Sequence, residues 1–202
     1  MQVTLYERVF RRRVTTRTAL VALGANLPHA GLSPGKTLLA ARDALIDGGL
    51  SLVAFSRLFQ TPAFPAGSGP DYLNAAAAFS VAKNVPSEQI LAHLHAVEAK
   101  FGRTRATRWG ARVLDLDLLA LDDLVMPDPA TQDLWRALPP ASQQVEVPGQ
   151  LILPHPRLQD RAFVLVPLAD VAPEWRHPRT GLTVAQMLAA LPPQDVAAVT
   201  PL

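Results

Sequence analysis

The chain has 202 residues, of which 49% are hydrophobic and 18% charged, so it can fill a sizeable core and does not belong to the disordered class. It contains no cysteine, which excludes a disulfide framework and thiolate metal sites and fits a reducing, cytoplasmic compartment. Its formal net charge is only +2, and no apolar run approaches the roughly 20 residues that a bilayer crossing needs, so a membrane partner is not expected.

Residues 1–17 are predicted to form a basic, flexible tail. They hold five arginines against one glutamate, a balance of +4, so residues 18–202 sum to −2. A nucleic-acid-binding domain would be basic throughout, and we therefore expect no nucleic-acid partner. The tail lacks the long apolar core of a secretory signal, although a transit peptide or a nucleic-acid-binding arm are alternatives to a simple leader.

The first half of the domain is predicted to contain three strands and one helix. Residues 18–23 form a short apolar run before a glycine and are predicted to be a buried strand. Residues 36–47 have helical apolar spacing, and two glycines end the helix. Residues 51–59 and 72–81 are predicted strands. The segment between them, 61–70, is too rich in proline and glycine for either regular element.

The second half is predicted to begin with a helix at 86–101 and an alternating strand at 113–121. Residues 122–150 contain five prolines and are expected to be an irregular insertion. Helices are predicted at 161–171 and 183–191, with a proline expected to interrupt the first. The order is strand, helix, strand, strand, helix, strand, which predicts a single α+β domain, a ferredoxin-like antiparallel sheet with helices packed on it.

The strongest chemical signal is a cluster of four arginines within residues 103–112, with no acidic residue among them. Arginine binds phosphate oxygens in pairs through a planar fork of fixed charge. In the strand that follows, alternation places Asp115 and Asp117 on one face and leucines on the other. Two adjacent carboxylates repel each other unless a cation lies between them, and magnesium is commonly held by carboxylates together with substrate phosphates. The combination favours phosphoryl transfer.

A simpler interpretation is that these arginines and aspartates form surface salt bridges. Trp109, which lies among the arginines and offers a stacking surface, favours a binding site instead. A second phosphate signal is discounted: residues 31–37 imitate a P-loop, but Ala30 stands where the motif needs its first glycine and Pro34 lies inside the loop.

A run of motifs covers residues 102–117: Gly102-Arg-Thr-Arg, Arg108-Trp-Gly-Ala-Arg112 and Leu114-Asp-Leu-Asp117. This block closely resembles the 6-hydroxymethyl-7,8-dihydropterin pyrophosphokinase family. Shorter matches follow the family's order at 22–27, 61–62, 71–75, 154–155 and 161–163, so the resemblance extends over about residues 19–191. It implies a magnesium-dependent enzyme of folate biosynthesis that transfers pyrophosphate from ATP to the hydroxymethyl group of the pterin and releases AMP.

The resemblance also implies a role for each matching residue. Asp115 and Asp117 would bind two magnesium ions, and Arg103 and Arg112 would assist the transfer from a mobile loop. The positions that match the ATP site are Glu98, Arg105, Arg108, Trp109, His155 and Arg161. Those that match the pterin site are Thr61, Pro62, Phe64, Tyr72, Asn74 and Phe163. This division is chemically sensible, since a flat polar heterocycle is well held between aromatic faces with an amide at its edge.

The chain departs from the family pattern in two places. Gln150 and Ile152 stand where some members have an arginine and a threonine, and the segment 122–150 is longer than in compact members. Two other functions were weighed: a non-enzymatic RNA-binding module and a kinase that transfers a single phosphate. The strands lack an aromatic RNA signature and residues 18–202 are acidic, which argues against the RNA-binding module. The resemblance implies the small molecules ATP and pterin as partners, and a monomer is expected.

Overall fold

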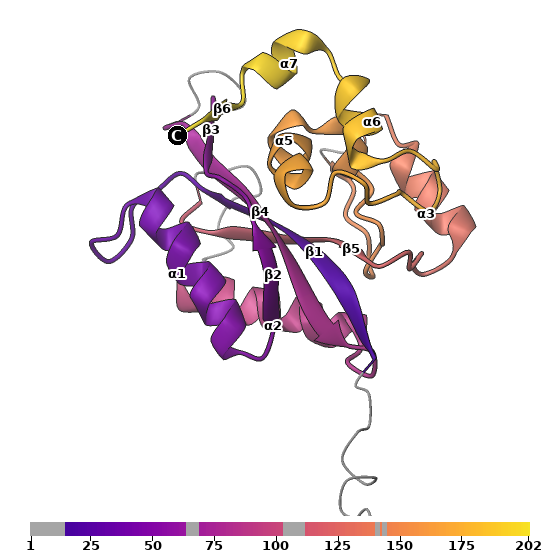
Figure 1. Cartoon of the computed structure of the whole chain (residues 1–202), viewed down its shortest axis with the longest axis horizontal. Coiled ribbons are helices and arrows are strands. Elements are labelled where there is room, and N and C mark those ends of the chain that lie inside the picture. The colour runs from indigo at the N-terminus through magenta and orange to yellow at the C-terminus, as the bar shows by residue number, and fades with distance from the viewer. Residues whose placement is uncertain (1–14, 64–68, 103–111, 140–141, 143–144) are drawn as a thin grey trace, which may run out of the picture.

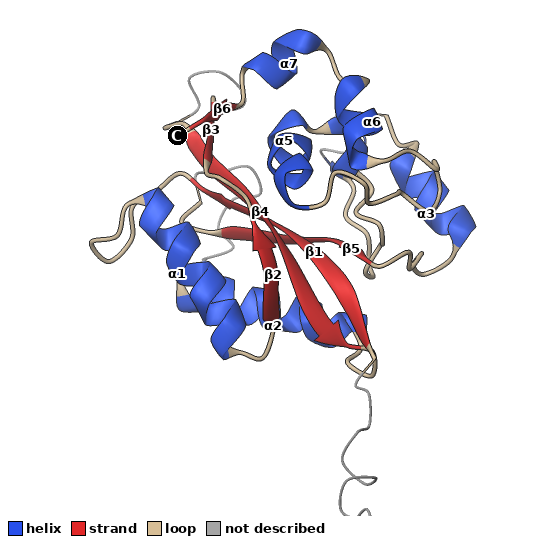
Figure 2. Ribbon diagram, in the orientation of Figure 1, coloured by secondary structure: helices blue, strands red, loops and turns tan. Residues whose placement is uncertain are grey.

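The computed structural model describes residues 15–63, 69–102, 112–139, 142 and 145–202, and it contains one antiparallel sheet with helices on both of its faces (Figures 1 and 2). The strands are β1 (Thr16–Ala25), β2 (Ser51–Phe55), β3 (Phe59–Thr61), β4 (Tyr72–Ala82), β5 (Asp115–Leu121) and β6 (Thr200–Pro201). The helices are α1 (Pro34–Asp47), α2 (Ser87–Lys100), α3 (Pro129–Arg136), η2 (Leu158–Asp160), α5 (Ala162–Val171), α6 (Val184–Ala189) and α7 (Pro193–Ala197).

The strand order is β5-β1-β4-β3-β6, with β2 also pairing with β4, and every pair is antiparallel. The predicted α+β fold with a ferredoxin-like antiparallel sheet is therefore confirmed. Central strand β1 pairs with β4 along its whole length and with β5 from Ala19 to Gly24. The sheet thus pairs β1 on one edge with residues 48–66 positions later in the chain and on the other edge with residues 91–102 positions later.

Alternation along β1 divides the apolar side chains between two cores. Val21 and Leu23 are buried in the core that α1 and α2 form with one face of the sheet. Leu20 points to the opposite face, where it is buried with side chains of α5 and α6. Figure 1 shows the same division, with α1 and α2 on one side of the sheet and α5 and α6 on the other. Both faces of the sheet are therefore covered, which explains why its strands are hydrophobic over nearly their full length.

The alanine run of β4 allows α5 to lie close to the sheet. Ala76 and Ala78 are 1% and 4% exposed and belong to the core beneath α5. The prediction that a proline interrupts this helix was wrong, because Pro167 lies inside a continuous α5 and is itself buried. Packing of α5 against the sheet outweighs the one backbone hydrogen bond that proline removes.

Two further differences from the sequence prediction concern strands. The predicted strand 51–59 is split into β2 and β3, since Ser56 leaves the strand while its backbone and its hydroxyl both bond to the backbone of Ala76. β1 begins at Thr16, so Arg17, assigned above to the tail, lies in the sheet opposite Val81. The rest of residues 1–17, up to residue 14, lies outside the described residues.

The remaining differences lie in the C-terminal third. The segment 122–150, expected to be irregular, contains α3, and α7 and β6 were not predicted at all. The α6 prediction is confirmed: Thr183 and Gln186 form a capping box in which each side chain accepts from the other residue's backbone N–H. Over the described part of the chain, none of the helices combines the length and the apolar character needed to span a bilayer.

Candidate functional site

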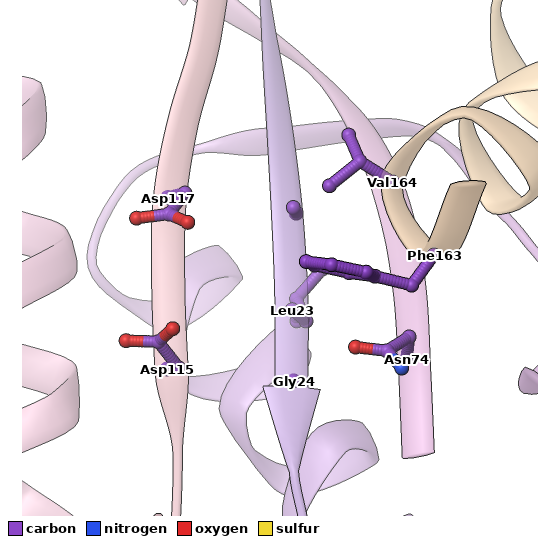
Figure 3. Close-up of a pocket in the computed structure, with 8 residues that line it drawn as sticks. Leu23, Gly24, Asn74, Asp115, Asp117, Phe163 and Val164 are labelled. Carbon is purple, nitrogen blue, oxygen red and sulfur yellow. The ribbon is translucent and has the colours of Figure 1, made fainter. Parts of the chain in front are cut away.

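Three neighbouring strands place a carboxylate, a glycine and an amide side by side. In the sheet register, Gly24 of β1 lies between Asp115 of β5 and Asn74 of β4. The next row on the same face holds Asp117 beside Ala22. Figure 3 shows both aspartates projecting from one strand toward the side on which Phe163 reaches over β1 from α5. The predicted shared face of the two aspartates is thus found.

A cavity of about 30 Å³ lies over these two rows. It is lined by Ala22, Leu23, Gly24, Asn74, Asp115, Asp117, Phe163 and Val164. A β-carbon added at Gly24 would lie 3.2 Å from Oδ1 of Asn74, so glycine leaves the space between the amide and the carboxylate open. A volume of this size admits only one or two water-sized groups, so any larger ligand must extend beyond it.

The opposite face of β5 explains why the aspartates hold their direction. Leu116 and Leu118 are buried in the core with α1 and α2. Glu98 of α2, only 1% exposed, accepts a hydrogen bond from the backbone N–H of Leu116 at 2.8 Å. The structure therefore places Glu98 behind the strand that carries the aspartates. It is absent from the lining of the cavity, although the resemblance assigned it to the nucleotide.

The aspartate pair has a cationic neighbour. A guanidinium nitrogen of Arg112 lies 2.5 Å from a carboxylate oxygen of Asp115. Burial alone would lower the pKa of Arg112, but the carboxylates of Asp115 and Asp117 outweigh it and raise that pKa. Tyr72 lies within the same electrostatic environment: burial raises the pKa of its phenol, Arg112 lowers it and Asp115 raises it, with a net increase. These groups are close enough to act on one bound anion.

On the other side of Gly24, the amide of Asn74 has a fixed orientation. Its Nδ2 donates to the hydroxyl of Thr61 at 2.7 Å, and both side chains are buried. Because Nδ2 is used in this way, Oδ1 remains turned toward the cavity, where Figure 3 shows it. Phe163 is 41% exposed, and the guanidinium of Arg161 lies over its ring at 5.6 Å. An amide and an accessible aromatic ring thus face one opening.

His155 is held as a neutral hydrogen-bond donor. Burial of the imidazole, together with the positive charges of Arg161 and Arg157, lowers its pKa to about 3. Its Nδ1 accepts from the backbone N–H of Arg157 at 3.1 Å, so in the neutral ring the proton lies on Nε2. The charge of Asp115 also acts on His155, which places the ring on the aspartate side of the site.

The remaining predicted site residues fall into two groups. Pro62 is described and lies exposed just after β3, next to the predicted Thr61. Arg103, Arg105, Arg108, Trp109 and Phe64 lie outside the described residues. The structure thus brings together the two aspartates, Arg112, the Asn74–Thr61 pair, Tyr72 and Phe163, with His155 and Arg161 at the same end.

The sequence analysis missed Asn26, which joins two of the segments that border the site. It is 3% exposed; its Oδ1 accepts from the backbone N–H of Arg112 at 2.7 Å and its Nδ2 donates to the carbonyl of Pro70 at 3.1 Å. The backbone N–H of Asn26 also donates to the carbonyl of Arg112 at 3.0 Å. The sequence did hold a signal for Asn26: it is a polar residue that follows an apolar strand and Gly24 closely. A polar side chain that is buried at such a position needs hydrogen-bond partners.

The described residues hold no cluster of three or more His, Asp or Glu side chains arranged as a metal site. Two carboxylates on one strand face, Asp115 and Asp117, are the donors available. This donor set suits an oxygen-preferring ion that is completed by substrate oxygens and water.

Comparison with known proteins gives a consistent result. The family model described as 7,8-dihydro-6-hydroxymethylpterin-pyrophosphokinase (HPPK) matches residues 20–173. A 2-amino-4-hydroxy-6-hydroxymethyldihydropteridine pyrophosphokinase of Synechocystis is 34% identical over 171 residues, 84% of this chain and 74% of the relative. The Pseudomonas aeruginosa protein of the same name is 35% identical over 173 residues, 85% of this chain and 90% of the relative.

Among solved structures, a Plasmodium falciparum HPPK-DHPS chain is similar with a TM-score of 0.62 and 14% identity. The similarity covers 91% of this chain and 46% of that longer chain. At this identity the likeness concerns the fold, and it agrees with the antiparallel sheet described above.

Proposed function

This chain belongs to the 7,8-dihydro-6-hydroxymethylpterin-pyrophosphokinase family, and from that premise we propose how its own residues divide the work of the reaction. The chain is an ATP-dependent pyrophosphokinase of folate biosynthesis: it transfers pyrophosphate from ATP to the hydroxymethyl group of 6-hydroxymethyl-7,8-dihydropterin and releases AMP. The observation that supports the assignment best is the row of Asp115, Gly24 and Asn74, which sets a phosphate-side carboxylate beside a pterin-side amide.

In the proposed reaction the hydroxymethyl oxygen attacks the β-phosphorus of ATP. A new P–O bond forms there, the bond between the β-phosphorus and the oxygen bridging it to the α-phosphorus breaks, and AMP leaves with the electron pair while the hydroxyl proton is released. We assign no side chain as general base. Positioning of the two substrates and stabilisation of phosphate charge supply most of the acceleration, as in other phosphoryl transfers.

Asp115 and Asp117 are proposed to hold two magnesium ions together with the triphosphate. The donor set fits, because magnesium prefers oxygen ligands and is usually bound by one or two carboxylates plus substrate phosphates. Bound magnesium would neutralise phosphate charge. Arg112, paired with Asp115 at 2.5 Å, is proposed to act with Arg103 on the transferring group.

The pterin is proposed to bind against Asn74, whose free Oδ1 would accept from the polar edge of the heterocycle. Phe163 and Tyr72 would supply aromatic surface for its faces, and Thr61 would hold the amide. Pro62 and Phe64 complete the proposed pterin set.

ATP is proposed to bind at the end of the site that holds His155 and Arg161. A neutral imidazole with its proton on Nε2 can donate to a phosphate or a ribose, and Arg161 supplies a fixed positive charge. The proposed ATP set also contains Arg105, Arg108 and Trp109. Glu98 completes the set, and its bond to the backbone N–H of Leu116 also supports the strand between the two aspartates.

We further propose that the chain acts as a monomer in the cytoplasm and has no nucleic-acid partner. The absence of cysteine fits a reducing compartment, and the net charge of −2 over residues 18–202 argues against a nucleic-acid partner. Sedimentation at micromolar concentration would contradict the monomer if it gave a dimer mass.

The nucleotide product tests the proposed function. With ATP, magnesium and hydroxymethyl-dihydropterin, AMP and the pterin pyrophosphate ester should form in equal amounts, whereas ADP would indicate a simple kinase. Asp115→Asn and Asp117→Asn should each reduce turnover by at least about 100-fold, the effect of removing one well-placed electrostatic group from a catalytic site. Near-normal turnover of either variant in magnesium would contradict the metal assignment.

A further inference from the structure

Helix α3 lies in the segment 122–150 and has no part in the assignments above. It begins after Asp128, whose carboxylate accepts from the backbone N–H and the hydroxyl of Thr131 at 2.9 and 2.7 Å. Leu134 on its outer face is 65% exposed, whereas Gln132 has no exposed surface. Burying an unpaired amide is unfavourable, so a fully buried glutamine on a short surface helix needs internal partners. Among the described residues its Oε1 has none, and its Nε2 makes the one hydrogen bond of the amide.

That contact is with the segment that carries His155. Nε2 of Gln132 donates to the carbonyl of Pro154, the residue immediately before His155, at 3.3 Å. The preceding residue, Leu153, exchanges two backbone hydrogen bonds with Met126, at 2.9 and 3.2 Å. The backbone N–H of His155 donates to the carbonyl of Leu119 in β5 at 2.8 Å. Residues 153–155 are therefore held between β5 on one side and the start of the α3 segment on the other.

The outer side of α3 is fixed as well. The carboxylate of Asp133 accepts from Arg179 at 3.1 and 2.5 Å and from Arg136 at 3.0 Å. Hydrogen bonds from these two guanidinium groups hold the pKa of Asp133 well below its usual range. These bonds attach α3 to the loop around Arg179 through Asp133. Gln132, one residue earlier in the helix, is buried.

The direction of the His155 ring depends on this backbone. Nδ1 of His155 accepts from the N–H of Arg157, so the ring is oriented from the main chain on its C-terminal side. On its N-terminal side the main chain is oriented through Pro154. A shift of the Pro154 carbonyl would rotate the plane of the peptide that joins it to His155. The Nε2 proton of His155 would then move away from the phosphate or ribose of ATP to which it is proposed to donate.

We propose that Gln132 is a positioning residue for the nucleotide half of the site, acting through Pro154 on the imidazole of His155. The inference rests on the proposed role of His155 in binding ATP. It assigns a function to the insertion: α3 is a buttress, docked by Asp133 on one side and reaching Pro154 with Gln132 on the other.

The test compares Gln132→Met, which keeps the length of the side chain and removes the donor, with Leu134→Ala on the exposed face of the same helix. Binding of a methylene-bridged ATP analogue with magnesium is measured by calorimetry, and binding of the pterin separately. We expect Gln132→Met to raise the dissociation constant of the analogue roughly 3- to 30-fold and to leave that of the pterin within twofold. Leu134→Ala should change neither.

A double-mutant cycle asks whether the effect passes through His155. In a His155→Ala background, Gln132→Met should weaken analogue binding no further, because the group it positions is absent. An additive effect in the double mutant, an equal loss of pterin affinity, or unchanged analogue affinity would each overturn the proposal.

Hydrogen exchange of the His155 amide provides a readout that does not require turnover. Gln132→Met, or Asp133→Asn if the first variant does not fold, should accelerate exchange of the Leu153 and His155 amides at least threefold relative to Leu134→Ala. Unchanged exchange in the folded variant overturns the proposal. The product assay on the wild-type protein tests the proposed function separately, because absence of AMP would reject that function. Exchange of the His155 amide would still test whether Gln132 holds the segment that carries His155.

Discussion

At the scale of single residues, the hydroxyl of Thr61 decides how Asn74 can be used. The amide could be turned either way, but its Nδ2 is bonded to this hydroxyl at 2.7 Å inside the protein. Thr61→Val keeps the shape of the side chain and removes the acceptor, leaving a buried donor unpaired. We expect pterin affinity to fall by about 5- to 50-fold, which corresponds to 1–2.5 kcal/mol for a lost buried partner. Calorimetry with the pterin alone measures it.

Thr61→Ser is the matched control for this prediction, since serine retains the hydroxyl and loses only a methyl group. It should bind the pterin within about threefold of wild type. Equal affinities for the valine and serine variants would show that the hydroxyl does not orient the amide.

His177 is another residue whose state follows from burial. It has no exposed surface, and its Nδ1 accepts from the backbone N–H of Arg179 at 3.1 Å. Burial, reinforced by the positive charge of Arg136, lowers its pKa from 6.5 to about 4. Between these two values the unfolded chain binds more protons than the folded one, so the free energy of unfolding should fall as the pH is lowered through this window.

Titration of His177 should therefore make the free energy of unfolding about 2 kcal/mol lower at pH 5 than at pH 7.5. His177→Asn keeps an acceptor near the position of Nδ1 and cannot titrate. Urea unfolding at several pH values measures both proteins. The variant should lose less stability than wild type between pH 6.5 and 4.5, and parallel curves would contradict the buried neutral state.

How far site residues could be predicted depends on how local their determinants are. The shared face of Asp115 and Asp117 follows from alternation within seven residues of one strand, and the sequence was sufficient. The bonds of Asn26 to Arg112 and Pro70 join positions 86 and 44 residues apart, and no local pattern encodes them. Glu98 shows a third case: its motif position predicts a role in the ATP site, and the bond of its carboxylate to the backbone N–H of Leu116 could not be read from the sequence.

At the scale of elements, close packing of α5 on β4 depends on the alanines beneath the helix. Ala76→Val would insert two methyl groups at a position that is 1% exposed. We expect a loss of about 1–3 kcal/mol in the free energy of unfolding, because a filled core accommodates added volume only by displacing the helix. Ala82→Val, at the partly exposed end of the same strand, is the control and should change stability by less than about 0.5 kcal/mol.

Elements with a strong internal period were predicted well, and those that depend on packing were not. α1, α2 and β4 have clear apolar patterns and end near their predicted limits. The division of 51–59 into β2 and β3 depends on a bond between Ser56 and Ala76, which the pattern of the strand itself does not contain. The helix α3 was obscured by its prolines, although Pro129 occupies the first turn, where proline is tolerated.

At the scale of the whole molecule, Asn26 ties two distant segments to the end of β1. Asn26→Asp retains an acceptor for the N–H of Arg112 but cannot donate to the carbonyl of Pro70, whereas Asn26→Ala loses both bonds. We expect the aspartate variant to lose pterin affinity, since Pro70 leads into Tyr72 and Asn74, and the alanine variant to lose turnover in addition. Each lost bond should account for roughly a 5- to 50-fold change.

Separate measurement of the pterin dissociation constant and of kcat distinguishes the two bonds. Indistinguishable aspartate and alanine variants would mean that Asn26 acts only as a general part of the fold. Melting temperatures of both variants serve as the control for global unfolding.

Strand β1 is synthesised before both of its partners, and this order shapes how the chain emerges from the ribosome. β4 can pair with β1 early, but β5 begins 90 residues after Ala25, about 5–18 s of translation at typical speed. During that interval an apolar central strand has one edge of unpaired N–H and C=O groups, which can template association with other nascent chains. Stalled chains that end before Asp115 should therefore be captured by chaperones and digested readily by protease, whereas chains that extend well past Leu121 should resist both.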